Sequence, residues 1–226
     1  KINSIVWTPV DSLPLLDKHL DSVKNTNNYV VQASFAKKAL EDNPHNDVHL
    51  FPVPIDPSNF FRMKEGDRQE LRVSKGIGPD EFIVGFVFRN QLRKSVPNLL
   101  QGFRSFLKEN PQTKAKLLFH THWSEGWDIP KLLIEHEIDP SLVLTTHYCD
   151  KCNNYEIKPF AGQNTDCPLC GSKGSQQTAQ ITRGVNENQL NEIYNLMDTY
   201  CHAFTSGGQE IPIQEAKLTE LVTLVT

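Results

Sequence analysis

The sequence predicts an α/β fold built on parallel sheets, and three observations support this. Apolar runs typical of strands alternate with helical patterns along most of the chain. The run FIVGFVF at 82–88 is apolar throughout, which is typical of a central parallel strand buried on both faces. Two Cys-x2-Cys pairs between Cys149 and Cys170 interrupt the alternation, so we expect a small insertion there.

Composition and charge fit an ordinary soluble protein of one large or two medium domains. The 226 residues are 38% hydrophobic and carry a formal charge of -4, which argues against a basic nucleic-acid-binding face. No apolar run approaches the roughly 18 residues of a membrane span, and we expect no signal peptide. We therefore expect a cytoplasmic location. Because the chain begins at Lys1 and starts and ends in strand-like patterns, we expect a piece of a longer protein.

The first part of the chain, residues 1–61, alternates between the two periods. We expect strands at 2–7, 29–32 and 48–51 and helices at about 13–24 and 35–42, with Ser12 and Ser34 as N-caps. This order indicates a parallel, doubly wound sheet. Residues 52–61, PVPIDPSNFF, contain three prolines and are expected to cross between domains.

The second part, residues 62–226, continues the alternation. We expect strands at 82–88, 116–122, 141–147 and 221–226, and helices after Gly66, Ser95, Ile129 and Asn186. The helix capped by Ser95 carries an apolar face made of Leu99, Leu100, Phe103, Phe106 and Leu107. Asn186 and Gln189 have the spacing of a capping box.

The segment TSGGQEIPIQEA, residues 205–216, is expected to join an apolar strand ending in YCHAF to a helix that carries Glu215. Gly207 and Gly208 permit close approach of a ligand, and Pro212 suits a first helical turn, whose N–H groups favour an anion. Glu215 could accept hydrogen bonds from sugar hydroxyls at the same place. The alternative is an ordinary turn with a solvated glutamate.

Arg89 and Lys94 directly follow the apolar strand at 82–88. Open α/β sheets bind ligands at the carboxyl ends of their strands, and a diphosphate needs cations such as an arginine fork and a lysine point charge. The alternative is that both are solvated loop residues. Asp11 follows the first strand in the same manner, where it could orient an acceptor hydroxyl or cap the next helix.

The cysteine spacing, Cys149-x2-Cys152 and Cys167-x2-Cys170 with fourteen residues between the pairs, is typical of a zinc ribbon. Four thiolates close the coordination sphere, so we expect structural zinc in residues 147–174 and no catalytic metal. Disulfides and an iron–sulfur cluster are the alternatives.

The segment at 205–216 resembles the signature loop of family 4 retaining glycosyltransferases of the GT-B fold, Glu-Gly-Phe-Gly-x-Pro-x-x-Glu-Ala. Gly208, Pro212, Glu215 and Ala216 match, whereas Gly207 stands where the first glutamate is usual. The Arg89-x4-Lys94 spacing is also similar to that family's diphosphate-binding pair. Val10 stands where the family often has the histidine of a His-Asp pair, of which Asp11 remains.

This resemblance implies a partial acceptor-side Rossmann-like domain with its hinge at 1–61. Residues 62–226 would then be a Rossmann-like nucleotide-sugar-binding domain, incomplete at its C-terminus and interrupted by the ribbon at 147–174. The implied activity transfers a hexose from a UDP- or GDP-linked sugar to an unknown glycan, lipid or protein, with retention. No nucleic acid is expected as a partner.

Residue roles also follow from the resemblance. Arg89 and Lys94 would neutralise the leaving diphosphate, Glu215 would hold the donor ribose, and Asp11 would lie near the acceptor. Other donor contacts are implied for Gly207, Gly208, Gln209, Glu210, Ile211, Gly184 and Val185.

Gly207 and Val10 motivate an alternative function. The chain would be a degenerate transferase that acts as a binding or assembly module through its ribbon. A zinc-ribbon nucleic-acid binder is the third possibility.

Overall fold

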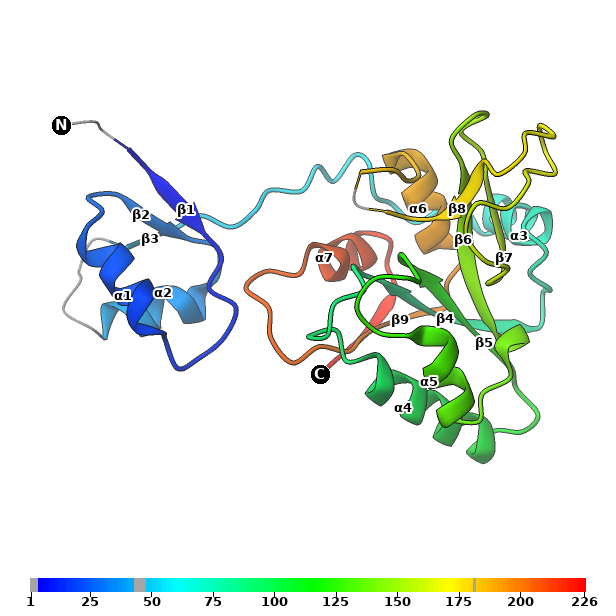
Figure 1. The fold of residues 1–226 in the computed structure, drawn as a ribbon, viewed down its shortest axis with the longest axis horizontal. Helices are drawn as coiled ribbons and strands as arrows, with labels where there is room; N and C mark the ends of the chain where they lie inside the picture. Colours follow the sequence, from blue (N-terminus) through cyan, green and yellow to red (C-terminus); the bar gives the residue numbers. More distant parts are fainter. Residues whose placement is uncertain (1–3, 43–47, 181) are drawn as a thin grey trace. The chain divides into compact units, whose positions relative to one another are not determined.

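The computed structural model describes residues 4–42, 48–180 and 182–226, and the chain divides into two compact units (Figure 1). Unit 1 comprises residues 1–55 and 206–211, and unit 2 comprises residues 56–205 and 212–226. The first two residues of the strand expected at 2–7 lie outside the described ranges.

Unit 1 contains a parallel three-stranded sheet in the order β1-β2-β3. Its elements are β1 (Val6–Thr8), α1 (Asp17–Lys24), β2 (Tyr29–Val31), α2 (Ser34–Glu41) and β3 (Val48–Leu50). The expected alternation and the parallel pairing are therefore confirmed.

Both helices of unit 1 pack into one core. Val23 of α1 and Leu40 of α2 are buried with Val31 of β2 in a single apolar cluster. Trp7 and Phe51 instead stay 45% and 59% exposed, with ring centroids 6.0 Å apart. The described helices therefore cover one face of this sheet, not the two that a doubly wound sheet requires.

The expected start of the first helix is wrong. Helix α1 begins at Asp17 with Leu16 as its N-cap, so neither Ser12 nor Asp11 caps it. Leu13 precedes Pro14, and a residue before proline is disfavoured in helical conformation, which delays the start of the helix. Ser34 is the first residue of α2, whose N-cap is Ala33, and no side-chain cap bond forms there.

Unit 2 is built on a seven-stranded mixed sheet in the order β10-β9-β4-β5-β6-β7, with β8 also paired to β6. Its strands are β4 (Glu81–Val87), β5 (Lys114–His120), β6 (Val143–Cys149), β7 (Tyr155–Pro159), β8 (Gln176–Thr178), β9 (Thr199–His202) and β10 (Val222–Val225). Strands β4, β5, β6, β9 and β10 are parallel to their neighbours in this group.

Helices lie on both faces of this sheet, α4 and α5 on one and α3 and α6 on the other (Figure 1). The helices are α3 (Glu65–Ser74), α4 (Val96–Glu109), α5 (Ile129–Glu135), the 3-10 turn Pro140–Leu142, α6 (Glu187–Asn195) and α7 (Ile211–Leu218). The predicted face of α4 is confirmed, since Leu99, Leu100 and Phe103 are buried in the core beneath β4 and β5.

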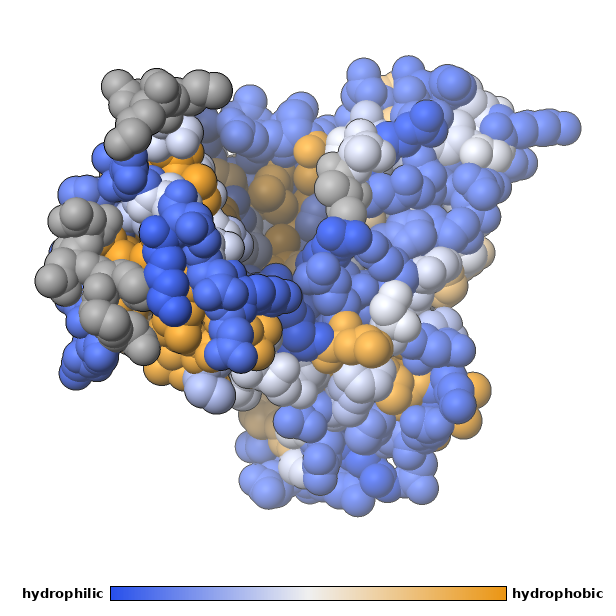
Figure 2. Space-filling model, turned by 60° about the vertical axis from the view of Figure 1, so that its left-hand side comes forward, coloured by the Kyte–Doolittle hydropathy of each residue, from blue (hydrophilic) through white to orange (hydrophobic). Residues whose placement is uncertain are grey.

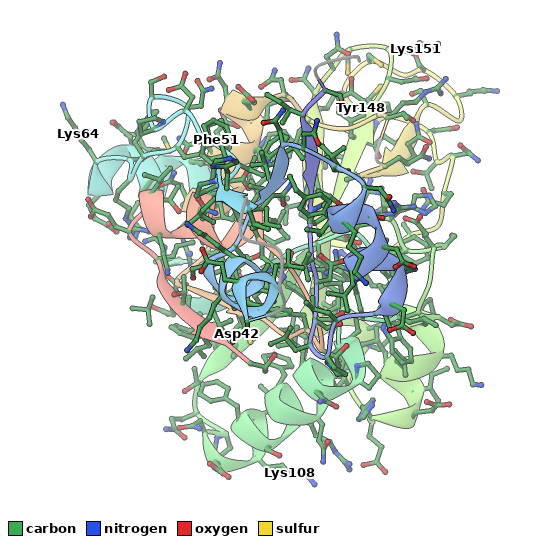
Figure 3. The ribbon with its side chains drawn as sticks, turned by 90° about the vertical axis from the view of Figure 1, so that its left-hand side faces the viewer. Asp42, Phe51, Lys64, Lys108, Tyr148 and Lys151 are labelled. Atoms are coloured by element: carbon green, nitrogen blue, oxygen red, sulfur yellow. The ribbon has the colours of Figure 1, made fainter. Side chains whose placement is uncertain are left out.

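The cysteine-rich insertion extends the main sheet. Both β7 and β8 pair antiparallel with β6, the strand that precedes the insertion. Pairing satisfies backbone groups that an edge strand would leave open, which explains why the insertion does not stand apart from the sheet. In Figure 3 its residues Tyr148 and Lys151 lie at the opposite end of unit 2 from Lys108 of α4.

In the view of Figure 2 hydrophilic residues cover most of the surface, and hydrophobic residues form separate groups among them. Of the helices in the described ranges, none has the length and apolar character that crossing a lipid bilayer needs.

A buried ionic cluster fastens α3 to the sheet. Asp198 accepts from Arg68 Nη2 at 2.6 Å, from Arg72 Nη1 at 3.1 Å and from the backbone N–H of Ile83 at 2.8 Å. The two arginine side chains are only 5% and 2% exposed. One carboxylate thus joins α3, β4 and the link between α6 and β9.

We predict that Asp198→Ala lowers the free energy of unfolding by about 3 kcal/mol, because it leaves two buried guanidinium groups without their carboxylate. Urea denaturation measures this. The matched control is Asp80→Ala, since the Asp80–Lys114 pair is 78% and 69% exposed and its loss should cost less than about 1 kcal/mol. Equal losses in both variants would contradict this role of Asp198.

Candidate functional site

Two loops of unit 2 lie side by side where β4 and β9 end. Lys94 forms an isolated backbone bridge with Phe204. The N–H of Ser95 donates to Ala203 O at 3.0 Å, and the N–H of Thr205 donates to Arg93 O at 2.9 Å. The loop after β4 is therefore held directly against the segment that follows β9.

Lys94 is buried at this junction, with 2% of its surface exposed. Its Nζ lies 2.9 Å from Nε2 of His202, the last residue of β9. Its carbonyl oxygen accepts from Trp127 Nε1 at 2.7 Å, which fixes the backbone of the loop. A buried ammonium loses its hydration, so this placement does not fit a solvated loop lysine.

Arg89 is held by a carboxylate that the sequence reasoning missed. Its Nε and Nη2 donate to Glu125 Oε1 at 3.0 Å and 2.6 Å, and its side chain is 50% exposed. Glu125 follows β5, which pairs with β4 through the register Val87 to His120. The signal in the sequence that could have identified Glu125 is its position shortly after β5, the strand beside β4.

Glu215 is a buried carboxylate on α7, 9% exposed. The hydroxyl of Tyr194 donates to its Oε2 at 2.6 Å. Burial raises the pKa of Glu215 and the nearby Glu187 raises it further, while the bond from Tyr194 opposes the shift. Tyr194 is itself fully buried, and its hydroxyl orients this carboxylate.

The glycines at 207 and 208 belong to unit 1, where Asp11 holds them. The N–H of Gly207 donates to Asp11 O at 2.8 Å and that of Gly208 to Asp11 Oδ1 at 3.0 Å. A Cβ on Gly208 would come within 3.0 Å of Val10 O, so this close approach favours glycine. Asp11 therefore binds the loop, and the N–H of Gly208, a residue with an implied donor contact, has a protein partner.

The next loop residue, Gln209, is also held within unit 1. Its side-chain amide accepts from Val53 N at 2.6 Å and donates to Val53 O at 3.0 Å. Hydrogen bonds to Asp11 and Val53 thus fix the positions of residues 207–209.

The start of α6 is formed as the sequence predicted. Asn186 caps the helix, and its side chain and that of Gln189 make the reciprocal bonds of a capping box. Gly184 and Val185 precede this cap and are partly exposed. Gln189 Nε2 also donates to Asn153 O at 2.8 Å, which ties the helix start to the insertion.

Unit 2 also contains a hollow of about 430 Å³ beside Glu125. Its lining residues are His122, Ser124, Glu125, Gln180 and Thr182. It extends from Glu125, the partner of Arg89, to Thr182, which lies two positions before Gly184. Its volume lies within the roughly 300–1,000 Å³ of small-molecule sites.

The four cysteines of the two Cys-x2-Cys pairs form one cluster. Their Sγ atoms all lie within 4.8 Å of one another, with Cys149 to Cys170 at 3.8 Å and Cys152 to Cys167 at 3.9 Å. A disulfide requires about 2.05 Å, so that alternative does not fit. Tetrahedral zinc with Zn–S bonds of about 2.3 Å places sulfurs about 3.8 Å apart, which the cluster matches.

The buried state of Glu215 predicts a specific pH dependence. Because its folded pKa is raised, wild-type stability should fall as pH rises from the unfolded value of about 4.3 through the folded pKa. Glu215→Gln removes the cost of ionising this buried carboxyl. The variant should therefore be more stable than wild type at pH 7, and the difference should vanish below about pH 4. Urea denaturation at several pH values tests this, and a less stable variant at pH 7 would contradict it.

The fold matches solved glycosyltransferase structures of the GT-B class. Sucrose-phosphate synthase from Thermosynechococcus elongatus superposes with a TM-score of 0.62 and 14% identity over 92% of this chain and 42% of that one. A glycosyltransferase from Rickettsia africae gives 0.62 and 8% identity over 95% and 49%. HepE from Anabaena, in complex with UDP and glucose, gives 0.59 and 12% identity over 92% and 48%.

At these identities the likeness concerns the fold, and the chain spans less than half the length of each of these three proteins. No family model and no curated protein matches the sequence.

Proposed function

We propose that this chain supplies the nucleotide-sugar site of a glycosyltransferase that transfers a hexose from a UDP- or GDP-linked sugar with retention. The observation that carries the proposal is the junction of the loops after β4 and β9, which buries Lys94 beside the end of β9. The hollow bounded by Glu125 supports it, as does the fold shared with HepE, whose structure contains UDP and glucose.

In this proposal Arg89 and Lys94 stabilise the negative charge that develops on the leaving diphosphate. The side chain of Arg89 is half exposed. Its guanidinium can therefore bind Glu125 and a phosphate together, or release Glu125 and bind the phosphate instead. Lys94 is buried, so its ammonium acts in a poorly hydrated place where charge interacts strongly.

Glu215 would bind the donor ribose. Tyr194 holds Oε2, which leaves Oε1 as the acceptor for a hydroxyl of the sugar. Gly184 and Val185 would contact the base, and residues 207–211 would complete the donor contacts through groups other than the N–H of Gly207 and Gly208, which donate to Asp11. Asp11 would stand on the acceptor side. The acceptor class, whether glycan, lipid or protein, is open in this proposal.

We predict that Arg89→Ala and Lys94→Ala each weaken binding of UDP and GDP by about 10- to 100-fold, since a charged hydrogen bond contributes about 1.5–3 kcal/mol. Calorimetric titration of the chain with each nucleotide measures this. Arg104→Ala is the matched control. Arg104 lies on α4, more than two helical turns after the loop that follows β4, and it pairs with Glu137. The proposal is wrong if wild type binds neither nucleotide or if both variants bind like wild type.

We also propose structural zinc in the Cys149, Cys152, Cys167 and Cys170 cluster. The metal would join the turn after β6 to the loop before β8, a stretch with little apolar content of its own. Bound zinc would supply folding free energy and no reaction chemistry, since protein thiolates fill all four positions.

We predict one zinc per chain by elemental analysis. Cys170→Ser should lower zinc affinity by more than the roughly 10- to 100-fold typical of changes outside the ligand set. Cys170 is exposed, so the substitution leaves packing intact. Cys201→Ser lies outside the cluster and should keep full zinc content. Iron with visible absorbance, in place of zinc, would favour the iron–sulfur alternative.

A further inference from the structure

A buried hydrogen-bonded chain connects Lys94 to the interior of the sheet. Lys94 Nζ lies 2.9 Å from His202 Nε2, and His202 Nδ1 lies 2.7 Å from the hydroxyl of Tyr200. That hydroxyl lies 3.0 Å from Val87 O, at the end of β4. Lys94 is 2% exposed, and His202 and Tyr200 are fully buried.

The direction of each bond follows from counting protons. Val87 O can only accept, so the single proton of the Tyr200 hydroxyl points to it. The tyrosine oxygen then accepts, and His202 Nδ1 must be the N–H that donates to it. In a neutral imidazole this leaves a lone pair on Nε2, which faces the ammonium of Lys94.

The other protonation states of His202 conflict with these contacts. A proton on Nε2 would point at an ammonium, which has no lone pair to accept it. An imidazolium would place two buried positive charges 2.9 Å apart.

Aromatic packing keeps the imidazole ring in place. Phe86 contacts it edge to face at a centroid distance of 5.1 Å, and Phe204 does so at 5.3 Å. The backbone of Lys94 is fixed independently by its bridge to Phe204 and by Trp127. The lysine is thus anchored both at its backbone and at its ammonium.

We propose that His202 is a positioning residue: a neutral imidazole, protonated on Nδ1, that orients the ammonium of Lys94 toward the donor diphosphate. The ligand in this statement rests on the proposed function, whereas the tautomer rests on the hydrogen bonds alone. The other N–H bonds of the ammonium then point in directions fixed by the sheet, and the ligand does not have to order the side chain.

Two substitutions separate the contacts of His202. His202→Asn places an amide near the position of Nδ1, so it can still donate to Tyr200 but withdraws the acceptor from Lys94. His202→Gln reaches the position of Nε2 with its carbonyl oxygen and restores that acceptor. We expect His202→Asn to weaken UDP or GDP binding about tenfold and His202→Gln to stay within about twofold of wild type.

A double-mutant cycle with Lys94→Ala shows whether the histidine acts through the lysine. With alanine at position 94, His202→Asn should cause no further loss of nucleotide binding. A loss as large as in wild type, or equal losses in the asparagine and glutamine variants, would overturn the positioning role. Retained binding in both variants would also overturn it. Thermal melting of every variant identifies any that fail to fold.

The tautomer is measured without nucleotide, by long-range proton–nitrogen NMR of the histidine rings, with His202→Gln to assign the signal. We expect His202 Nδ1 to carry the proton and Nε2 to be unprotonated, as the acceptor from Lys94. A proton on Nε2 or on both nitrogens would overturn the inferred geometry. If wild type binds neither nucleotide, the proposed function and the ligand part of this inference both fail, while the NMR result still decides the tautomer.

Discussion

The parallel pairing of β4 with β9 is the constraint on which the rest of unit 2 depends. The register joins Val84 to Thr199 and Gly85 to Tyr200, so strands far apart in sequence end at the same edge of the sheet. A Cβ on Gly85 would overlap the side chain of Met197, which lies between α6 and β9, so close packing at this pair favours glycine. This pairing brings Lys94 to His202.

Two ionisable side chains near this edge lose hydration in the folded state. The ammonium of Lys94 and the carboxylate of Glu215 are both buried, and burial disfavours the charged form of each. Each has a hydrogen-bond partner at the end of a helix or strand, His202 on β9 and Tyr194 on α6. Buried charged groups occur more often at functional sites than elsewhere, and in our proposal the role of these two is to bind the diphosphate and the ribose.

The periodicity of the sequence was sufficient to predict most helices and strands, because apolar spacing directly reflects which face of an element is buried. It failed at the start of α1, where Pro14 restricts the backbone of the residue before it and Ser12 does not cap the helix. It also failed at the insertion, whose pairing with β6 is made by backbone groups and leaves no pattern in the side chains. The cysteine cluster was predictable because its members are close in sequence. The partners Glu125, Tyr194 and His202 were not, because each meets its residue only through the sheet topology.

Gly207 remains the main departure from the loop that the segment resembles, and in the structure the neighbouring N–H of Gly208 is bound by Asp11. A degenerate module would keep the fold and lose the ligand, so locating the ligand separates the two accounts. The most direct measurement is a crystal structure of the chain with UDP or GDP bound. Our account predicts the diphosphate at Lys94 and Arg89 and the ribose at Glu215. A nucleotide bound elsewhere, or a diphosphate that contacts neither cation, would contradict it.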